Sequence, residues 1–296
     1  NGLDFVHGAK RARGARAVLA LPSRSLKGEP NIRISVEKYP NEFSLREAID
    51  MVVTEYGVAY LKGRTVRERA QALIEIAHPD DRPGLVEQAK EKRILYPDQI
   101  YLVESAHLYP EGIATKQTFK GGVEVRFRAI KPSDEEEMRR LFYRFSDEAV
   151  YYRYFSPIKA MPHAKMQEYV NVDFSQTLSI VGLVGDSGEG HIIAEARFVR
   201  ERNRPYAEAA FIVDEGYQGL GIATYLFKRL IQLAKKQGVK GFTADVLATN
   251  KGMMKVFEKS GLPIKAKMEY GVYSLTIPFE TEGSHSGEET PSGANA

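Results

Sequence analysis

The hydrophobic positions of residues 1–95 alternate between short apolar runs and a helical pattern. The apolar runs at 15–21 and 51–61 have the length of buried strands. Between Thr65 and Pro79 the apolar residues recur every three or four positions, as they do along one face of a helix. Strands and helices that alternate in this way are typical of an α/β fold, and we expect one over residues 1–95.

The pattern weakens over residues 96–122. Pro97, Pro110 and the glycine pair Gly121 and Gly122 interrupt it, and no periodicity persists between them. We interpret this segment as a connector between two units, partly packed through its tyrosines and leucines.

A second unit, with an α+β pattern, is predicted over residues 123–280. Alternation at 123–130 indicates its first strand, and we expect Ser133 to cap the following helix, with Glu136 completing a capping box. Three further apolar runs are joined by short, turn-rich links and predict an antiparallel meander: residues 177–185, 191–200 and 206–213.

A long amphipathic helix is predicted after this meander. From Ala223 to Ala234 the apolar residues fall at i, i+3, i+4, i+7, i+8 and i+11, which predicts one buried helix face. A strand over 239–247, a short helix after Asn250 and one or two closing strands complete the unit. Residues 281–296 are small and polar, which predicts a disordered tail.

Charge balance and composition exclude several classes of protein. The 296 residues include 42 Lys and Arg against 39 Asp and Glu, and a net charge of +3 does not favour nucleic acid or a membrane as the main partner. No apolar run approaches the roughly 20 residues that a membrane-spanning helix needs. The absence of cysteine rules out a thiolate nucleophile and a Cys-based zinc site, and the spacing of the six histidines indicates no metal site. We therefore expect a cytoplasmic protein without a metal.

Glycines gather between the third strand of the meander and the long helix. This segment, the candidate binding loop, reads Gln218, Gly219, Leu220, Gly221, Ile222, Ala223 and Thr224. Backbone amides at a helix N-terminus lack internal partners, and the helix dipole adds positive charge there. Because glycine has no Cβ, a phosphate can approach these amides closely, and the loop predicts a phosphate-binding site.

The residues alone leave the type of loop open. A Walker A loop needs a lysine directly after the glycines, but the next one is Lys228, well inside the helix. A dinucleotide fingerprint needs a third glycine where Thr224 stands, although Asp245 on a later strand keeps this alternative open. Glycines that only pack a strand–turn–helix are the third interpretation.

The pattern Q-x-x-G-x-A at Gln218–Ala223 is similar to the acyl-CoA-binding motif of the GNAT acetyltransferase superfamily. A strand ending at Val213 precedes it, and an amphipathic helix, a strand and Asn250 follow it, in the order of that superfamily. The resemblance covers residues 123–279. Three stretches resemble the bacterial Pat-type protein lysine acetyltransferases: VRFRAIKPSDEEEMRRLF, SDEAVYYRYFSP and YAEAAFIVDEGYQGLGIATYL. The resemblance implies a mixed, mostly antiparallel central sheet flanked by helices, with acetyl-CoA as acyl donor and a protein lysine as acceptor.

Glu208 is the candidate general base. Free lysine has a pKa of about 10.4, so a base must take its proton before the amine attacks a thioester. Strand alternation places Glu208 on one face with Ala210 and Ile212, apolar neighbours that we expect to raise its pKa. The resemblance places the base at this glutamate. The alternative is a solvated carboxylate, or an ion pair with Arg197 or Arg204.

The resemblance also implies the contacts to the acyl donor. Backbone groups of Phe211, Ile212 and Val213 would pair with pantetheine and stabilise the oxyanion. Asn250 matches an asparagine that contacts the cofactor arm, although it also fits a helix N-cap, and Met253 matches a packing position of the Pat-type group.

One position departs from the pattern of the superfamily. Many members carry a tyrosine as general acid where this chain has Phe257. Tyr270, Tyr273 or water are the alternatives for that role, which stays unassigned.

Residues 1–94 resemble the C-terminal part of the acetyl-CoA hydrolase/CoA-transferase family. The stretches that carry the resemblance are LDFVHGAKRARGARAVLALPS and VVTEYGVAYLKGRTVRERAQALIEIAHPDDR. No residue here matches the family's thioester-forming glutamate; Glu55 matches a glutamate near its active site, or is a buried hydrogen-bonding carboxylate. Because the first residue is Asn rather than Met, we expect an N-terminal remainder that this unit needs as its partner.

Three hypotheses follow for function. The first is acetyl transfer from acetyl-CoA to an amine, foremost a protein lysine, by direct attack with a glutamate as general base. The second is a small-amine N-acetyltransferase, and the third is a non-catalytic acetyl-CoA sensor that regulates an attached CoA-transferase. The sequence leaves the oligomeric state open.

Overall fold

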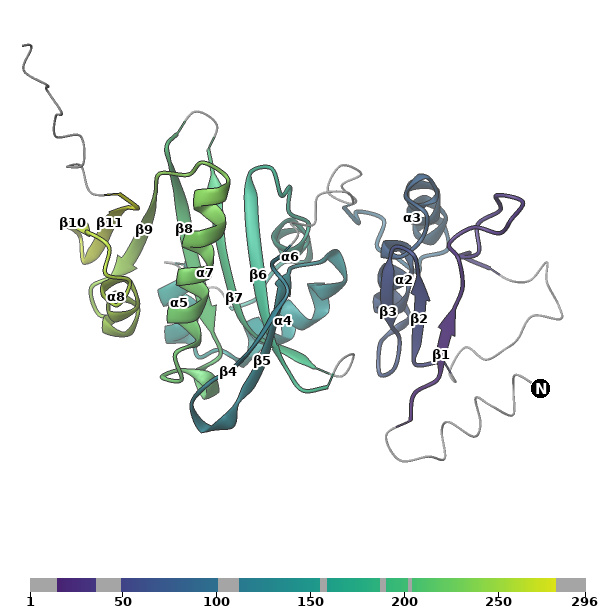
Figure 1. Cartoon of the computed structure of the whole chain (residues 1–296), viewed down its shortest axis with the longest axis horizontal. Coiled ribbons are helices and arrows are strands. Elements are labelled where there is room, and N and C mark those ends of the chain that lie inside the picture. The colour runs from purple at the N-terminus through teal and green to yellow at the C-terminus, as the bar shows by residue number, and fades with distance from the viewer. Residues whose placement is uncertain are drawn as a thin grey trace, which may run out of the picture.

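A computed structural model describes residues 15–35, 49–100, 112–154, 159–186, 190–201 and 204–280. The chain forms two units, each with its own sheet (Figure 1). The first sheet has the strand order β1-β2-β3, and the second has the order β10-β11-β9-β8-β7-β6-β5-β4. In the described part of the chain, none of the helices has both the length and the apolar character to cross a bilayer.

The first unit is the predicted α/β arrangement. Strand β1 (Val18–Ala20) runs parallel to β2 (Met51–Thr54), and β2 forms an antiparallel hairpin with β3 (Gly57–Tyr60). Helices α2 (Val66–Glu75) and α3 (Arg82–Glu91) supply buried apolar residues to its core.

The first strand departs from the prediction. Val18 is 52% exposed and Leu19 is 44% exposed, so β1 is not the buried strand that its apolar run predicted. Among the described strands, β1 pairs with β2 alone and lies at the edge of the sheet, where an apolar run need not be covered.

The predicted connector contains part of the second sheet. Residues 115–118 form strand β4 (Thr115–Thr118), which pairs antiparallel with β5 (Glu124–Ala129). The sequence TKQT carries no apolar alternation, and a polar edge strand leaves no hydrophobic signal. The proline Pro110 lies outside the described residues.

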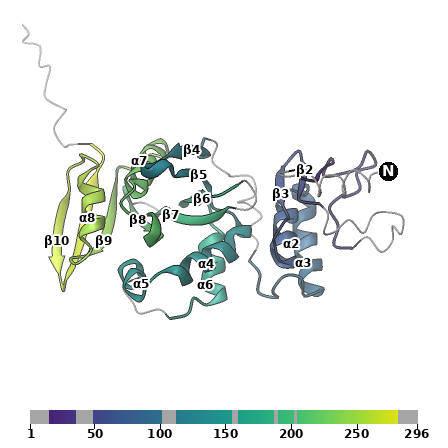
Figure 2. The same cartoon turned by 90° about the horizontal axis from the view of Figure 1, so that it is seen from below.

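The meander of the second unit is confirmed. Strands β6 (Thr177–Val184), β7 (His191–Arg200) and β8 (Tyr206–Val213) pair antiparallel in sequence order. Helices α4, α5 and α6 cover one face of this sheet and α7 covers the other (Figure 2). These helices are α4 (Glu135–Arg144), α5 (Asp147–Tyr154), α6 (His163–Val170) and α7 (Ile222–Lys236).

The predicted cap of α4 is wrong. A 3₁₀ turn, η4 (Pro132–Asp134), precedes the helix, and Asp134 rather than Ser133 accepts the Lys131 amide at 2.8 Å. The carboxyl of Glu136 pairs with Arg139 at 2.7 Å instead of closing a capping box. Asp134 also binds Arg128 through both carboxylate oxygens, an ion pair that a local cap motif does not reveal.

The last elements follow the predicted order. They are β9 (Gly241–Leu247), α8 (Lys251–Glu258), β10 (Lys265–Glu269) and β11 (Val272–Pro278). The apolar face of α7 is buried, and the ring of Phe227 packs against Phe211 of β8 and Phe257 of α8. The predicted tail, residues 281–296, lies outside the described residues.

Candidate functional site

Strands β8 and β9 part in the middle of the second sheet (Figure 1). Their parallel pairing extends only from Tyr206–Gly241 to Glu208–Thr243, although β8 continues to Val213 and β9 to Leu247. Each strand keeps its other neighbour, β7 or β11. The edges of β8 and β9 that face each other are therefore open beyond Glu208, and an extended ligand can pair with them as a strand would.

A glycine closes the narrow end of this opening. A Cβ built on Gly241 would overlap the ring of Tyr206 and the carbonyl oxygen of Ile277. The close approach of β8 and β9 at this point therefore depends on the missing side chain.

Backbone alternation determines which groups of β8 face the opening. The Asp214 amide donates to the Ile193 carbonyl of β7 at 2.7 Å. Successive peptide groups of a strand point to opposite sides, so the N–H and C=O groups of Val213 and Phe211 point away from β7. Those of Ile212 point toward β7. Of the three backbone contacts that the sequence analysis named, the geometry favours the two at Phe211 and Val213.

The candidate binding loop lies directly after this open edge. Gly221 is the N-cap residue of α7, and no side chain caps the helix. Gly219 and Gly221 have φ values of 74° and 101°, a left-handed conformation that favours glycine. A Cβ on Gly219 would meet no atom within 4 Å, so space in front of the loop is open. The uncapped amides and the helix dipole together suit an anionic group.

The other loop residues have mainly structural positions. The Gln218 side chain donates to the Val213 carbonyl at 3.1 Å and ties the loop to the end of β8. The side chain of Ile222 is buried, whereas Leu220 and Ala223 are partly buried against the core. Thr224 is half-buried within the first turn of α7. Backbone amides, rather than side chains, are the groups that this loop offers to a ligand.

Glu208 is exposed, which differs from the buried apolar setting that the sequence predicted. It lines a pocket of about 320 Å³ at the narrow end of the opening. The pocket's other lining residues come from β7, β8, β9 and the β7–β8 link: Val199, Glu201, Arg204, Pro205, Tyr206, Thr243, Ala244 and Asp245. Asp245 lies in the same pocket as Glu208, a juxtaposition of two strands that its position in the sequence does not predict.

The candidate arginine partners of Glu208 are engaged elsewhere. Arg204 pairs with Glu201 at 2.8 Å, and Arg197 donates to Glu195 at 2.6 Å. The pocket thus holds the carboxylates of Glu208 and Asp245 in addition to the Arg204–Glu201 pair, and its charge favours a cationic guest.

A buried polar network underlies the same face of the sheet. Glu195 is 0% exposed and accepts from the Ser179 hydroxyl at 2.6 Å and from the Tyr169 hydroxyl at 2.9 Å. Burial raises the pKa of Tyr169, and also that of Tyr154 in α5. The network joins β6, β7 and α6. In the sequence it could have been recognised from Glu195 and Arg197, two charged residues inside an otherwise apolar strand.

Asn250 serves as an N-cap. Its side-chain oxygen accepts from the Met253 amide at 3.1 Å, and Met253 packs partly buried against the core. Phe257 is 1% exposed, with its ring centroid 5.0 Å from that of Phe227. Tyr270 is fully exposed at the β10–β11 turn. The packing explains a phenylalanine at 257, since this ring fills an aromatic cluster.

In the first unit, Glu55 is an exposed carboxylate held by Ser23. The Ser23 hydroxyl donates to it at 2.5 Å and the Ser23 amide at 2.8 Å, and these hydrogen bonds lower the pKa of Glu55. It is therefore a hydrogen-bonding carboxylate, but not the buried one that the sequence suggested.

Two family models match the chain. Residues 1–89 match the acetyl-CoA hydrolase/transferase C-terminal domain, and residues 137–262 match the acetyltransferase (GNAT) family. The 4-hydroxybutyrate coenzyme A transferase of Clostridium kluyveri is 43% identical over 91 residues, which are 30% of this chain and 21% of that protein. Acetyltransferase Pat of Mycolicibacterium smegmatis is 34% identical over 164 residues, which are 52% of this chain and 48% of that protein.

A solved structure supports the fold of the second unit. The GNAT domain of S. lividans PAT superposes with a TM-score of 0.54 and 28% identity, covering 58% of this chain and 99% of that domain. The chain spans less than half the length of either curated relative. The second unit is therefore a GNAT-family N-acetyltransferase domain, joined to a segment similar to the C-terminal domain of acetyl-CoA hydrolases and transferases.

Proposed function

We propose that the second unit transfers an acetyl group from acetyl-CoA to the amine of a protein lysine. The observation that carries the proposal is the opening between β8 and β9, which leads to the uncapped N-terminus of α7. An extended pantetheine arm matches the open strand edge, and a diphosphate matches the loop amides. The similarity of this domain to acetyltransferase Pat supports the same choice of reaction.

Backbone groups of the chain provide the binding chemistry. Phe211 offers its N–H and C=O groups to the pantetheine amides, and Val213 offers its N–H, since its carbonyl already accepts from Gln218. The amides of Gly219, Gly221 and Ile222 offer donors to the phosphates. The Phe211 amide is also suited to stabilise the negative charge that develops on the thioester oxygen during attack.

Glu208 takes the proton of the acceptor amine. It precedes Phe211 by three residues on the same strand, about 10 Å at 3.3 Å per residue, so the transfer runs through intervening water. Asp245 lies in the same pocket and attracts the lysine in its protonated form. The pocket is lined largely by exposed residues, so it is open. An open pocket suits a lysine side chain that a protein presents, whereas a small amine would be better held by an enclosed one.

The substitution Glu208→Gln tests the base. We expect kcat to fall by a factor of roughly 10² to 10⁴, and the remaining rate to lose its dependence on the ionisation of this carboxyl. Coenzyme A affinity, measured by calorimetry, should stay unchanged because the loop and the open edge are intact. Glu201→Gln, at the rim of the same pocket, is the matched control and should keep most of the activity. Undiminished turnover by the Glu208 variant across the pH range would remove the base assignment.

The sensor hypothesis rests on Phe257, because the phenyl ring leaves no hydroxyl at that position to protonate the thiolate. Wild-type protein that binds coenzyme A but acetylates no member of a broad panel of lysine peptides, proteins and amines would select it. For the first unit, we propose that it contributes to a CoA-transferase-type site, because it is similar to the C-terminal domain of acetyl-CoA hydrolases and transferases.

A further inference from the structure

Helix α4 contacts the segment that precedes the binding loop. Arg144, the last residue of α4, donates to Asp214 Oδ2 at 2.8 Å and also to the Ile192 carbonyl. The second carboxylate oxygen of Asp214 accepts the Gly216 amide at 3.1 Å. Directly after α4, the Ser146 hydroxyl donates to Glu215 at 2.6 Å. The turn that leads from β8 into Gln218 is therefore held from outside by the C-terminal end of α4.

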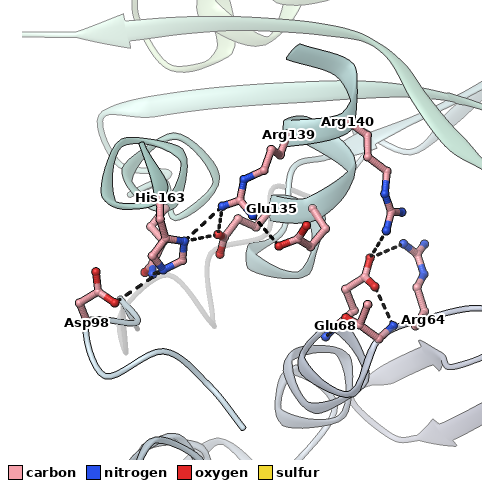
Figure 3. Close-up of polar contacts among 10 residues, drawn as sticks. Arg64, Glu68, Asp98, Glu135, Arg139, Arg140 and His163 are labelled. Atoms are coloured by element: carbon pink, nitrogen blue, oxygen red, sulfur yellow. Dashed lines mark hydrogen bonds and ion pairs between the residues drawn. The ribbon is translucent and has the colours of Figure 1, made fainter. Parts of the chain in front are cut away.

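The same helix is also contacted by the first unit, one turn before Arg144. Figure 3 shows Glu68 of α2 between Arg64 of its own unit and Arg140 of α4. Glu68 is 2% exposed, and its carboxylate lies 3.3 Å from Arg64 and 3.6 Å from Arg140. Arg140 pairs in addition with Glu137 of its own helix. The Arg140 side chain is 48% exposed, whereas the Glu68 carboxylate is buried and needs a cationic partner, so the pair links α4 to α2.

Two further contacts fix the position of α4. The Ser133 amide, in the turn before the helix, donates to Glu75 of α2 at 3.0 Å. On the side of α6, Glu135 lies 2.6 Å from His163, the first residue of that helix (Figure 3). These contacts leave α4 little freedom to move independently of α2 and α6.

Arg140 and Arg144 are four residues apart, so they project from the same side of α4 on successive turns. A ten-residue helix is a rigid element, and a displacement at its contact with the first unit moves Arg144 as well. We infer that Arg144 is a positioning residue for the candidate binding loop. Through α4, a change in the position of the first unit against this helix changes the position of that loop. The inference rests on the proposed function for the identity of the ligand, coenzyme A.

Calorimetry with coenzyme A and the full chain tests this inference without any acetyl transfer. We expect Arg144→Gln to raise the Kd for coenzyme A by about fivefold. Without the Arg144–Asp214 contact the loop is less ordered, and binding must then supply the free energy to order the loop. The KM for acetyl-CoA should rise with it, while the KM for the acceptor stays unchanged. Arg144→Lys keeps the charge and should recover part of the affinity. Arg229→Gln in α7 is the control: this half-buried arginine bonds Gln232 and the Gly112 carbonyl but not the turn before the loop, so the Kd should stay unchanged.

A double-mutant cycle tests the connection to the first unit. Arg140→Gln should also raise the Kd for coenzyme A, by about twofold. The Kd of the double variant should rise by less than the product of the two single increases. An unchanged Kd in Arg144→Gln overturns the positioning role, and strictly multiplicative effects overturn the transmission through α4. Wild-type protein that fails to bind coenzyme A would instead remove the proposed function, and this inference with it.

Discussion

The backbone of Gly221 shows what the binding loop demands of a single residue. Its φ of 101° lies in the left-handed region, and it is the N-cap from which α7 starts. The nearest atom to a Cβ built there is Phe119 Cδ1 at 3.9 Å, which is an ordinary contact. Glycine is therefore needed at this position for its backbone conformation and for an open approach to the amides, rather than for tight packing against the protein.

Gly221→Ala should lower the free energy of unfolding by about 1 to 2 kcal/mol, the usual cost of a left-handed alanine. It should also raise the Kd for coenzyme A, because the loop leaves the conformation in which its backbone N–H groups point toward one site. Urea unfolding and calorimetry measure the two effects. Gly252→Ala is the control: this glycine lies in α8 without a positive φ, and alanine should stabilise it by about 0.5 kcal/mol or more. Equal stability changes in both variants would contradict the account.

Strand β8 supplies groups to the site through its backbone on one edge and through Glu208 on one face. The pairing with β9 ends at Glu208, so the edge of the strand changes from paired to open within its own length. A side-chain pattern cannot encode this change, because the apolar residues of β8 are buried on both sides of that point. The aromatic packing of Phe211 on Phe227 keeps the open part of the strand in place.

Hydrogen exchange can detect the open edge directly. Addition of coenzyme A at 100 times its Kd should slow exchange of the Phe211 and Val213 amides by up to about a hundredfold, because the ligand closes their hydrogen bonds. The Ile212 amide, which faces β7, should change much less and is the internal control. Equal protection of all three amides would show that the ligand stabilises β8 as a whole and does not pair with its edge.

At the scale of the whole molecule, the two units share a partly charged interface between α2 and the turn before α4. Glu75 of α2 accepts the Ser133 amide there. Burial raises the pKa of Glu75, and the opposing effects of Lys131 and of the Ser133 amide do not cancel it. A carboxyl with a raised pKa in the folded state stabilises the fold fully below its unfolded pKa and loses that contribution as the pH rises through its folded pKa.

Glu75→Gln should therefore make the protein more stable at pH 7.5, by roughly 1 kcal/mol, because the amide still accepts from Ser133 but carries no charge to bury. The difference from wild type should close as the pH approaches the ordinary carboxyl pKa of 4.5. Urea unfolding at several pH values measures it. Glu87→Gln in α3, where the glutamate pairs with Lys90 on the surface, should show no comparable trend. A Glu75→Gln variant less stable than wild type at pH 7.5 would contradict this reasoning.

Some features of the chain follow from neighbouring residues alone. The helix α7, the strands of the meander and the glycines of the binding loop were all predictable, because hydrophobic period and glycine conformation are local properties of the chain. The capping box of α2, formed by Thr65 and Glu68, is local in the same sense. Where the local signal was weak or ambiguous, the prediction failed, as it did for the polar strand β4 and for Ser133 as a cap.

Tertiary structure alone decided how the site is assembled. The separation of β8 from β9 depends on pairing between distant strands, and the exposure of Glu208 follows from where that pairing stops. The contact of Arg144 with Asp214 joins residues 70 positions apart, and no periodicity links them. The amino-acid order determined which elements form and where the glycine loop and the start of α7 lie, since those depend on adjacent residues. Packing of the finished elements determined which carboxylates, amides and arginines meet, since these contacts arise only when distant segments come together.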